Sequence, residues 1–289
     1  MAINLASKYE NKVSERFTLG SLTDAGAGHD YDFMGVKTIS VYNVDTVATA
    51  AYTRSGTSRY GNLTELGDTK QELTLTQDRG FTFSIDAGNA SEQFNIKQAN
   101  ASLKREIDEV ITPEIDKYRL AKWASGNGLS SGNSVLTSND GALTKANIVE
   151  KIFTASATMS DNKVPRNGRT LYIPELEFVK FRLADAVMGA DKIDEENIRR
   201  GYRGTLDGMM VVTVPSSIMP TGVNFIIKYK NATVDPFKLK NYRVQKNPMG
   251  VDGDVVEGRY IYDAFVLDSK CKGIYVSKSA SASASESTS

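Results

Sequence analysis

The sequence predicts an α+β fold, and three features of the chain indicate it. A long amphipathic helix is expected over residues 89–126, and it carries Trp123, the only tryptophan. A long β-hairpin is expected before it, over residues 36–86, and long antiparallel strands after it, near the C-terminus. The stretch between the helix and these strands mixes helical and strand patterns, so we expect an α/β region there.

Length and composition limit the possible functions. The 289 residues are enough for one large domain or two, and the hydrophobic fraction of 40% is enough for a substantial core. The formal net charge is zero, so no overall basic character indicates nucleic-acid binding. No apolar run is long enough to span a membrane, and the N-terminal residues show no apolar signal-peptide core. The single cysteine, Cys271, excludes an intramolecular disulfide and a cysteine-cluster metal site.

Residues 1–35 are expected to form an extended arm that lies on another surface. Polar and small residues dominate this stretch, and its apolar residues show no sustained period. His29, the only histidine, lies in the sequence GHDYD. A metal site needs more ligands than this stretch offers, and catalysis needs a nucleophile nearby, so we expect an ordinary loop residue.

The hairpin is expected to use VKTISVYNVDT as its first arm and QELTLTQ with FTFSID as its second. The Gly, Ser and Thr-rich stretch RSGTSRYGNLTELGDT between them is typical of a loop tip. A two-stranded hairpin is marginal in water and its edges invite pairing, so it needs cover from its own chain or from a neighbour. Its tip carries charges suited to ion pairs across a subunit boundary: Arg54, Arg59, Glu65 and Asp68.

The long helix has clear start and stop signals. Asn89 is a good N-cap, Glu92 completes a capping-box-like pair, and Gly126 is the stop. Pro113 is expected to kink the helix because it lacks an N–H and crowds the preceding turn. About 35 residues would span roughly 50 Å. One face carries an apolar stripe, and the opposite face carries Lys97, Lys104, Arg105, Asp108, Glu109, Asp116, Lys117 and Lys122.

Two shorter helices and several strands are expected after the helix. The flexible connector GNGLSSGNSVLTSNDGA lacks the third glycine and the preceding strand of a dinucleotide-binding loop. A helix over Lys145–Met159 is capped by Thr144, RTLYIP is a short buried strand, and a third helix covers 174–188. The inward residues expected of these helices are Ile148, Ile152, Ala155 and Met159 in the first, and Leu176, Val179, Leu183 and Val187 in the second.

The C-terminal part reads as two or three long antiparallel strands followed by a low-complexity Ser/Ala tail. The acidic residues Asp252, Asp254 and Glu257 lie near the turn between two of the strands, but their spacing does not fit a calcium loop, so we expect a polar turn. Cys271 is expected in a strand, where neighbouring lysines could lower its pKa. No base lies near it in the sequence, which favours a structural thiol.

The order of these elements resembles the major capsid protein of tailed bacteriophages, a fold shared with encapsulins. The resemblance is carried by the hairpin, the long helix, LYIPELEFVKF, RRGYRGTLDGMMVVTVP and RYIYDAFVLDSKCKGIYV. It implies an N-terminal arm (1–35), an extended loop (36–88), a peripheral domain with the long helix as its spine (89–135 and 235–277), an axial domain (136–234) and a disordered tail (278–289).

The resemblance also implies a structural subunit, not an enzyme, with no cofactor. Such a subunit assembles with itself in hexamers and pentamers into an icosahedral shell around double-stranded DNA, is made in the bacterial host cytoplasm and ends in the virion. A portal and a decoration protein are possible partners, and a separate scaffolding protein is expected because only about 35 residues precede the hairpin. Weak DNA contact is expected from Lys97, Lys104, Arg105 and Lys122, with Asp108, Glu109 and Asp116 limiting the local field.

Three alternatives stay open at this stage. An encapsulin-type nanocompartment shell protein would share the fold. A tail-tube or other virion structural protein would suit the hairpin and the long strands but would not need the long helix. An enzyme is the third class, against which we count the missing catalytic motifs.

Overall fold

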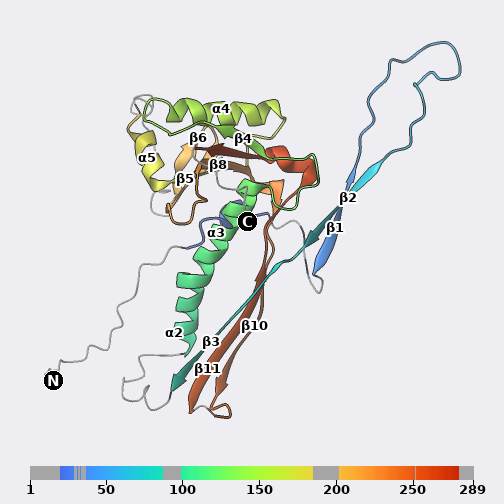
Figure 1. The fold of residues 1–289 in the computed structure, drawn as a ribbon. Helices are drawn as coiled ribbons and strands as arrows, with labels where there is room; N and C mark the ends of the chain where they lie inside the picture. The colour runs from blue at the N-terminus through green and yellow to red at the C-terminus, as the bar shows by residue number, and fades with distance from the viewer. Residues whose placement is uncertain are drawn as a thin grey trace, which may run out of the picture.

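The computed structural model describes residues 20–28, 31, 33, 37–86, 99–184, 202–250 and 252–279. They form three parts: an α/β body, a limb in which a three-stranded sheet runs beside a long helix, and a two-stranded hairpin that projects away from both (Figure 1). The fold is α+β, as the sequence predicts. His29 lies outside the described residues, as do residues 1–19.

A mixed six-stranded sheet forms the body, in the order β4-β13-β8-β5-β7-β6. Its strands are β4 (Leu136–Asn139), β5 (Arg169–Pro174), β6 (Tyr202–Leu206), β7 (Met209–Val214), β8 (Val223–Tyr229) and β13 (Ile274–Lys278). β5 lies in the interior of the sheet and is buried over its whole length, which confirms the short buried strand. β13 pairs with β4 and β8, so the chain returns to the body at its C-terminal end, and this strand includes Lys278 of the expected tail.

α4 (Ile148–Asp161) and α5 (Glu175–Arg182) cover one face of this sheet (Figure 1). The four residues predicted to face inward from α4 are all fully buried, which confirms the helix and its orientation. The predicted cap is wrong, because the helix begins at Ile148 and its N-cap position is Asn147 instead of Thr144. They pack against Leu171 and Ile173 of β5 and Phe225 and Ile227 of β8. The opposite sheet face packs against the end of the long helix through Leu120 and Trp123.

The predicted inward face of α5 is wrong. Leu176, Val179 and Leu183 are exposed, whereas Phe178 and Phe181 are buried against the sheet. Both sets have helical spacing, and burying two phenylalanine rings removes more apolar area from water than burying the smaller aliphatic side chains. Val187 lies outside the described residues.

The spine helix is continuous over the described residues but is not α-helical throughout. It consists of α2 (Ala99–Glu106), a π-helical turn η2 (Ile107–Ile111) and α3 (Thr112–Ser125). These have 8, 5 and 14 residues, or about 40 Å at 1.5 Å each. Gly126 ends the helix in the left-handed conformation with φ 70°, as predicted. The expected N-cap, Asn89, lies outside the described residues, as does Glu92.

The helix is irregular next to Pro113, where the π-helical turn precedes α3; the predicted kink itself stays a prediction. Pro113 occupies the start of α3, where its missing N–H leaves a carbonyl of the preceding turn without its usual donor. A π-helical turn shifts the hydrogen-bonding pattern by one residue and is one of the identifiable causes of irregularity in a helix.

The limb sheet has the order β10-β11-β3, with β10 (Phe237–Lys246), β11 (Gly253–Tyr262) and β3 (Gln77–Asp86). β3 contains the segment expected to complete the second arm of the hairpin, so that expectation is wrong for residues 77–86. They pair with β11, where the Phe81 ring lies over Gly258 and Phe83 is paired with Val256. β11 also packs against the spine through Tyr260 and Tyr262, which gives this sheet the apolar cover that a two-stranded hairpin lacks.

The hairpin itself is shorter than predicted. β1 (Thr38–Val44) pairs antiparallel with β2 (Asp68–Thr74), and residues 45–67 connect them without regular structure. At its base, Leu73 and Leu75 are buried in a small cluster with Phe265 and Leu267. The hairpin is therefore attached at one end and exposed over the rest of its length (Figure 1).

The remaining elements connect the body with the limb. The short strands β9 (Thr233–Val234) and β12 (Phe265–Val266) pair with each other. The 3-10 helix η3 (Lys230–Ala232) directly precedes β9, and η4 (Asp268–Gly273) follows β12, whereas η1 (Asp24–Gly26) belongs to the N-terminal segment. Cys271 lies in η4 and not in a strand, which corrects that prediction; it is buried. The sequence DSKCKG has no apolar–polar alternation that would favour a strand.

Candidate inter-subunit contact site

The tip of the hairpin exposes the four charged residues that the sequence singles out. Arg54, Arg59, Glu65 and Asp68 are all exposed. The Arg59 guanidinium donates to the Gly56 carbonyl oxygen at 3.1 Å, and Asp68 begins β2. Within the described residues, none of the four forms an ion pair with its own chain. Whether they pair with another copy stays a prediction.

The hairpin also carries a group of exposed apolar side chains that the sequence reasoning missed. Tyr60 is 87% exposed and Leu63 is fully exposed, and the Tyr52 and Tyr60 rings meet edge to face at 5.2 Å between centroids. The signal was available, since large apolar residues are unusual in a Gly/Ser-rich loop tip. We call this group the apolar arm, and its members are Tyr42, Val44, Val47, Tyr52, Tyr60, Leu63 and Leu66.

A short N-terminal segment, residues 20–28, is tied to the spine through a buried carboxylate. Asp116 accepts hydrogen bonds from the Ser21 hydroxyl at 2.9 Å and the Leu22 amide at 2.8 Å, and it also accepts from the Thr23 amide and hydroxyl. Arg119, also buried, donates to the Thr23 hydroxyl at 3.2 Å. The expectation that Asp116 lies on the solvated face of the helix is therefore wrong, because this segment covers it and satisfies its charge with hydrogen bonds.

The same segment continues over a second buried polar cluster. Lys228 and Asp235 are both 0% exposed, with 3.5 Å between the ammonium nitrogen and a carboxylate oxygen. Trp123 donates to Asp235 at 2.7 Å, and the Lys228 ammonium lies 4.0 Å from the centroid of the Trp123 ring. Burial lowers the pKa of Lys228 to about 8, although Asp235 opposes this shift.

Glycine is required where the segment crosses this cluster. A Cβ at Gly28 would lie 1.8 Å from the Thr233 carbonyl oxygen, and one at Gly26 would lie 2.0 Å from the Tyr172 hydroxyl. The Gly26 carbonyl accepts from Lys228, and the Gly28 amide donates to Asp235 at 2.9 Å. Together these contacts make residues 20–28 an integral part of the body.

The lysines and arginine proposed to face DNA do not form one uniform exposed surface. Lys104 is exposed, while Arg105 and Lys122 are half-buried; the Lys122 ammonium lies 5.3 Å from the centroid of the Tyr118 ring. Lys97 lies outside the described residues. Asp108 and Glu109 are half-buried on the same helix. The contact of these residues with DNA stays a prediction.

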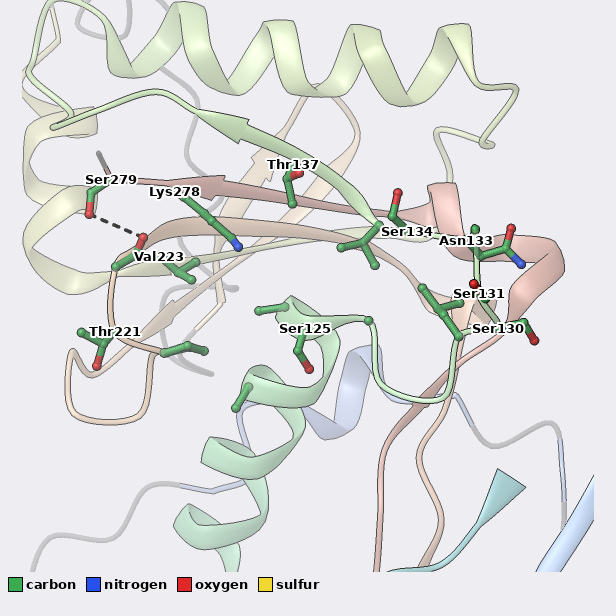
Figure 2. A pocket seen from close by; sticks show the side chains of 18 residues that line it. Ser125, Ser130, Ser131, Asn133, Ser134, Thr137, Thr221, Val223, Lys278 and Ser279 are labelled. Carbon is green, nitrogen blue, oxygen red and sulfur yellow. Dashed lines mark hydrogen bonds between the residues drawn. The ribbon is translucent and has the colours of Figure 1, made fainter. Parts of the chain in front are cut away.

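A groove of about 970 Å³ lies between the end of α3, the start of β4 and the turn at residues 220–223 (Figure 2). Serine and threonine side chains line it, with Lys278 as its charged residue. None of the described lining residues is a histidine, a cysteine or a carboxylate. Across the described part of the chain, no cluster of three or more His, Cys, Asp or Glu side chains could hold a metal ion.

No helix among the described residues combines the length and the apolar character needed to cross a lipid bilayer. No protein-family model matches the sequence, and no curated protein matches it. Solved structures do match the fold over nearly the whole chain.

The similar structures come from phages. A chain from Mycobacterium phage Che8 is 15% identical, with a TM-score of 0.73, and the match covers 96% of this chain and 98% of that one. A chain from the capsid structure of the cyanophage P-SCSP1u is 12% identical, with a TM-score of 0.72, covering 96% and 93%. A chain from the head structure of Helicobacter pylori bacteriophage KHP40 is 10% identical, with a TM-score of 0.62, covering 95% of each. The chain therefore has the fold of these phage capsid structures.

Proposed function

We propose that this protein is a structural subunit that assembles with itself into the icosahedral capsid of a tailed bacteriophage. The observation that carries the proposal is the apolar arm: seven large apolar side chains exposed on a thin hairpin that its own chain leaves uncovered. An exposed apolar surface of this kind marks an interaction site. The shared fold with phage capsid structures supports a second copy as the partner.

The proposal extends to the organisation of the subunit and its partners. The limb with the spine would be the peripheral domain, the body the axial domain, and copies would form hexamers and pentamers. A separate scaffolding protein, a portal, a decoration protein and synthesis in the host cytoplasm belong to the same proposal. The similar structures named above are phage structures, and they support a phage capsid protein better than an encapsulin-type shell protein or a tail-tube protein.

A structural role is also consistent with the residues that line the groove. The groove beside the end of α3 has no histidine, cysteine or carboxylate among its described lining residues, and we propose assembly and not catalysis as the activity. We propose only weak contact with the packaged genome, chiefly through Lys97, Lys104, Arg105 and Lys122. Tight binding would need many uncompensated phosphate contacts and a steep dependence on salt.

Electron microscopy of the purified protein, with sedimentation velocity at rising concentration, tests the proposal. Closed shells of uniform size are expected, with interfaces that bury well over about 1,000 Å² in total. Open tubes would favour a tail-tube protein, and small discrete particles at every concentration, with or without a scaffolding protein, would contradict assembly. Shells that copurify with a cargo protein would favour the encapsulin reading. Submicromolar, sequence-selective DNA binding by the subunit at physiological salt would also contradict the capsid proposal.

A further inference from the structure

The hairpin base contains a buried polar residue on an otherwise apolar face. In β2 the inward positions are Gln71 and Leu73, whereas Lys70 and Glu72 point outward and are exposed. Leu73 packs into the small apolar cluster at the base. Gln71 is buried, with 6% of its surface exposed. A polar side chain is unusual at such a position, where an apolar one would serve packing.

Gln71 ties the hairpin to two distant parts of the chain at once. Its amide nitrogen donates to the carbonyl oxygens of Gly128 and Val266, each at 2.8 Å. Its amide oxygen accepts from the backbone N–H of Asp268 at 3.0 Å. Both donors of the side chain are used, in directions set by a planar amide, so the contact restricts rotation of the strand as well as its distance from the body.

The residues that are hydrogen-bonded to Gln71 belong to two cross-linked segments, residues 127–133 and 263–268, which we call the platform. Asn127 donates its side-chain amide to the Ala264 carbonyl oxygen at 2.8 Å and accepts from the Val266 amide at 2.8 Å. The Asp268 carboxylate accepts from the Ser130 amide at 2.9 Å and from the Asn133 side chain at 3.0 Å. The platform therefore joins the end of the spine to the β12–η4 corner and offers a fixed base for the hairpin.

A second tie lies at the end of β2. The Thr76 amide and hydroxyl both donate to the buried Asp263 carboxylate, each at 2.8 Å. The Tyr118 hydroxyl of the spine donates to the same carboxylate at 2.9 Å. Two separate polar ties, one on β2 at Gln71 and one just beyond its end at Thr76, fix a direction. The apolar contacts of Leu73 alone would permit rocking, since apolar packing is not directional.

From these contacts we infer that Gln71 is a positioning residue that sets the direction of the hairpin in the free subunit. The inference rests on the proposed function, because direction matters only if the apolar arm must meet a second copy. A hairpin that is held in one direction has already lost its conformational entropy on folding. Less entropy is therefore lost when subunits associate. A Gln71 that only stabilised the fold would alter unfolding without altering where the tip lies.

The direction can be measured in the unassembled subunit. Spin labels at Ser58→Cys on the tip and Ala157→Cys on the exposed side of α4, in a Cys271→Ala background, report their separation by double electron–electron resonance. Gln71→Glu keeps the size of the side chain but places an oxygen against two carbonyls, and Gln71→Leu removes all three bonds. Both variants are expected to broaden the distance distribution about twofold or more, whereas the matched outward variant Glu72→Gln leaves it unchanged.

Assembly is the second readout. At equal thermal stability of the subunit, the concentration at which shells form is expected to rise about threefold to tenfold in the Gln71 variants and not in Glu72→Gln. A distribution that stays as narrow in both Gln71 variants as in the wild type overturns the inference. If the wild-type subunit shows a narrow distribution but never assembles, the proposed function fails while the positioning of the hairpin stands. If the distribution broadens without any change in the assembly threshold, the positioning role of Gln71 is supported, and only the link between hairpin direction and assembly fails.

Discussion

Replacing two residues of the apolar arm tests whether apolar contacts or ion pairs drive the association between copies. Tyr60→Ser with Leu63→Ser removes side chains that are 87% and fully exposed, so the free energy of unfolding of the subunit is expected to stay within about 0.5 kcal/mol of the wild type. If each contact between copies buries roughly 150 Å² of the Tyr60 ring alone, the lost burial at about 25 cal/mol per Å² is about 4 kcal/mol. Imperfect burial lowers this figure, and about 2 kcal/mol still corresponds to roughly thirtyfold in affinity.

The assay is the concentration at which light scattering and electron microscopy first detect shells. We expect the double serine variant to need at least about tenfold more subunit than the wild type. The charge reversal Arg54→Glu with Arg59→Glu is the comparison, because exposed ion pairs are worth at most about 1 kcal/mol. If the serine variant assembles at the wild-type threshold while the charge reversal does not, apolar contacts do not drive association. The result would then favour the ion pairs across the subunit boundary that the sequence suggests.

Four further predictions concern the stability of the subunit. Ile152→Ala, in the fully buried face of α4, is expected to lower the unfolding free energy by about 2–5 kcal/mol in denaturant titrations. Asp116→Ala is expected to release residues 20–28, which limited proteolysis followed by N-terminal sequencing detects as a new cut there, while Asp116→Asn, which keeps an acceptor, is cut more slowly. The pKa of Lys228 falls to about 8 on folding from 10.5, so the unfolded state binds more protons between these values and stability is expected to rise with pH from about 8. Burial raises the pKa of Tyr260 to about 12, so the folded state binds more protons above pH 10 and stability is expected to fall there. Thermal unfolding measured from pH 7 to 11 checks both signs, and a monotonic fall across the range would contradict the first.

The sequence predicts best where one local pattern decides the outcome. α4 has a single apolar stripe, so its inward face follows from helical spacing alone. α5 is different, because Leu176 and Phe178 belong to two competing stripes and only the shape of the sheet selects the aromatic one. The spine ends at Gly126 because glycine adopts the left-handed conformation without strain, which is again a local property.

Pairing between distant strands was not predictable in the same way. Strand patterns over residues 68–86 indicate that the chain is extended but not which partner it meets, and the structure divides this stretch between β1 and β11. The buried charges of Asp116 and Lys228 were missed for a related reason. The hydrogen-bond partners of Asp116 lie 93 to 95 residues away in the sequence. Lys228 has its ion-pair partner Asp235 nearby in the sequence, but the Gly26 carbonyl that it also bonds lies 202 residues away. A local pattern therefore does not show that these charges are buried.

The distribution of polar and apolar groups in this chain is itself an argument for assembly. A self-contained protein buries large apolar side chains and leaves its charges in water. In the body of this protein, charged side chains such as Asp116, Lys228 and Asp235 are buried and satisfied by hydrogen bonds, at a cost in desolvation that fixed contacts must offset. In the apolar arm, by contrast, the large apolar side chains of Tyr60 and Leu63 are exposed to water. They lie in the connection between β1 and β2, which has no regular strand edge for pairing. Attachment at the base and apolar exposure at the tip are together what the proposed assembly with another copy in one orientation requires.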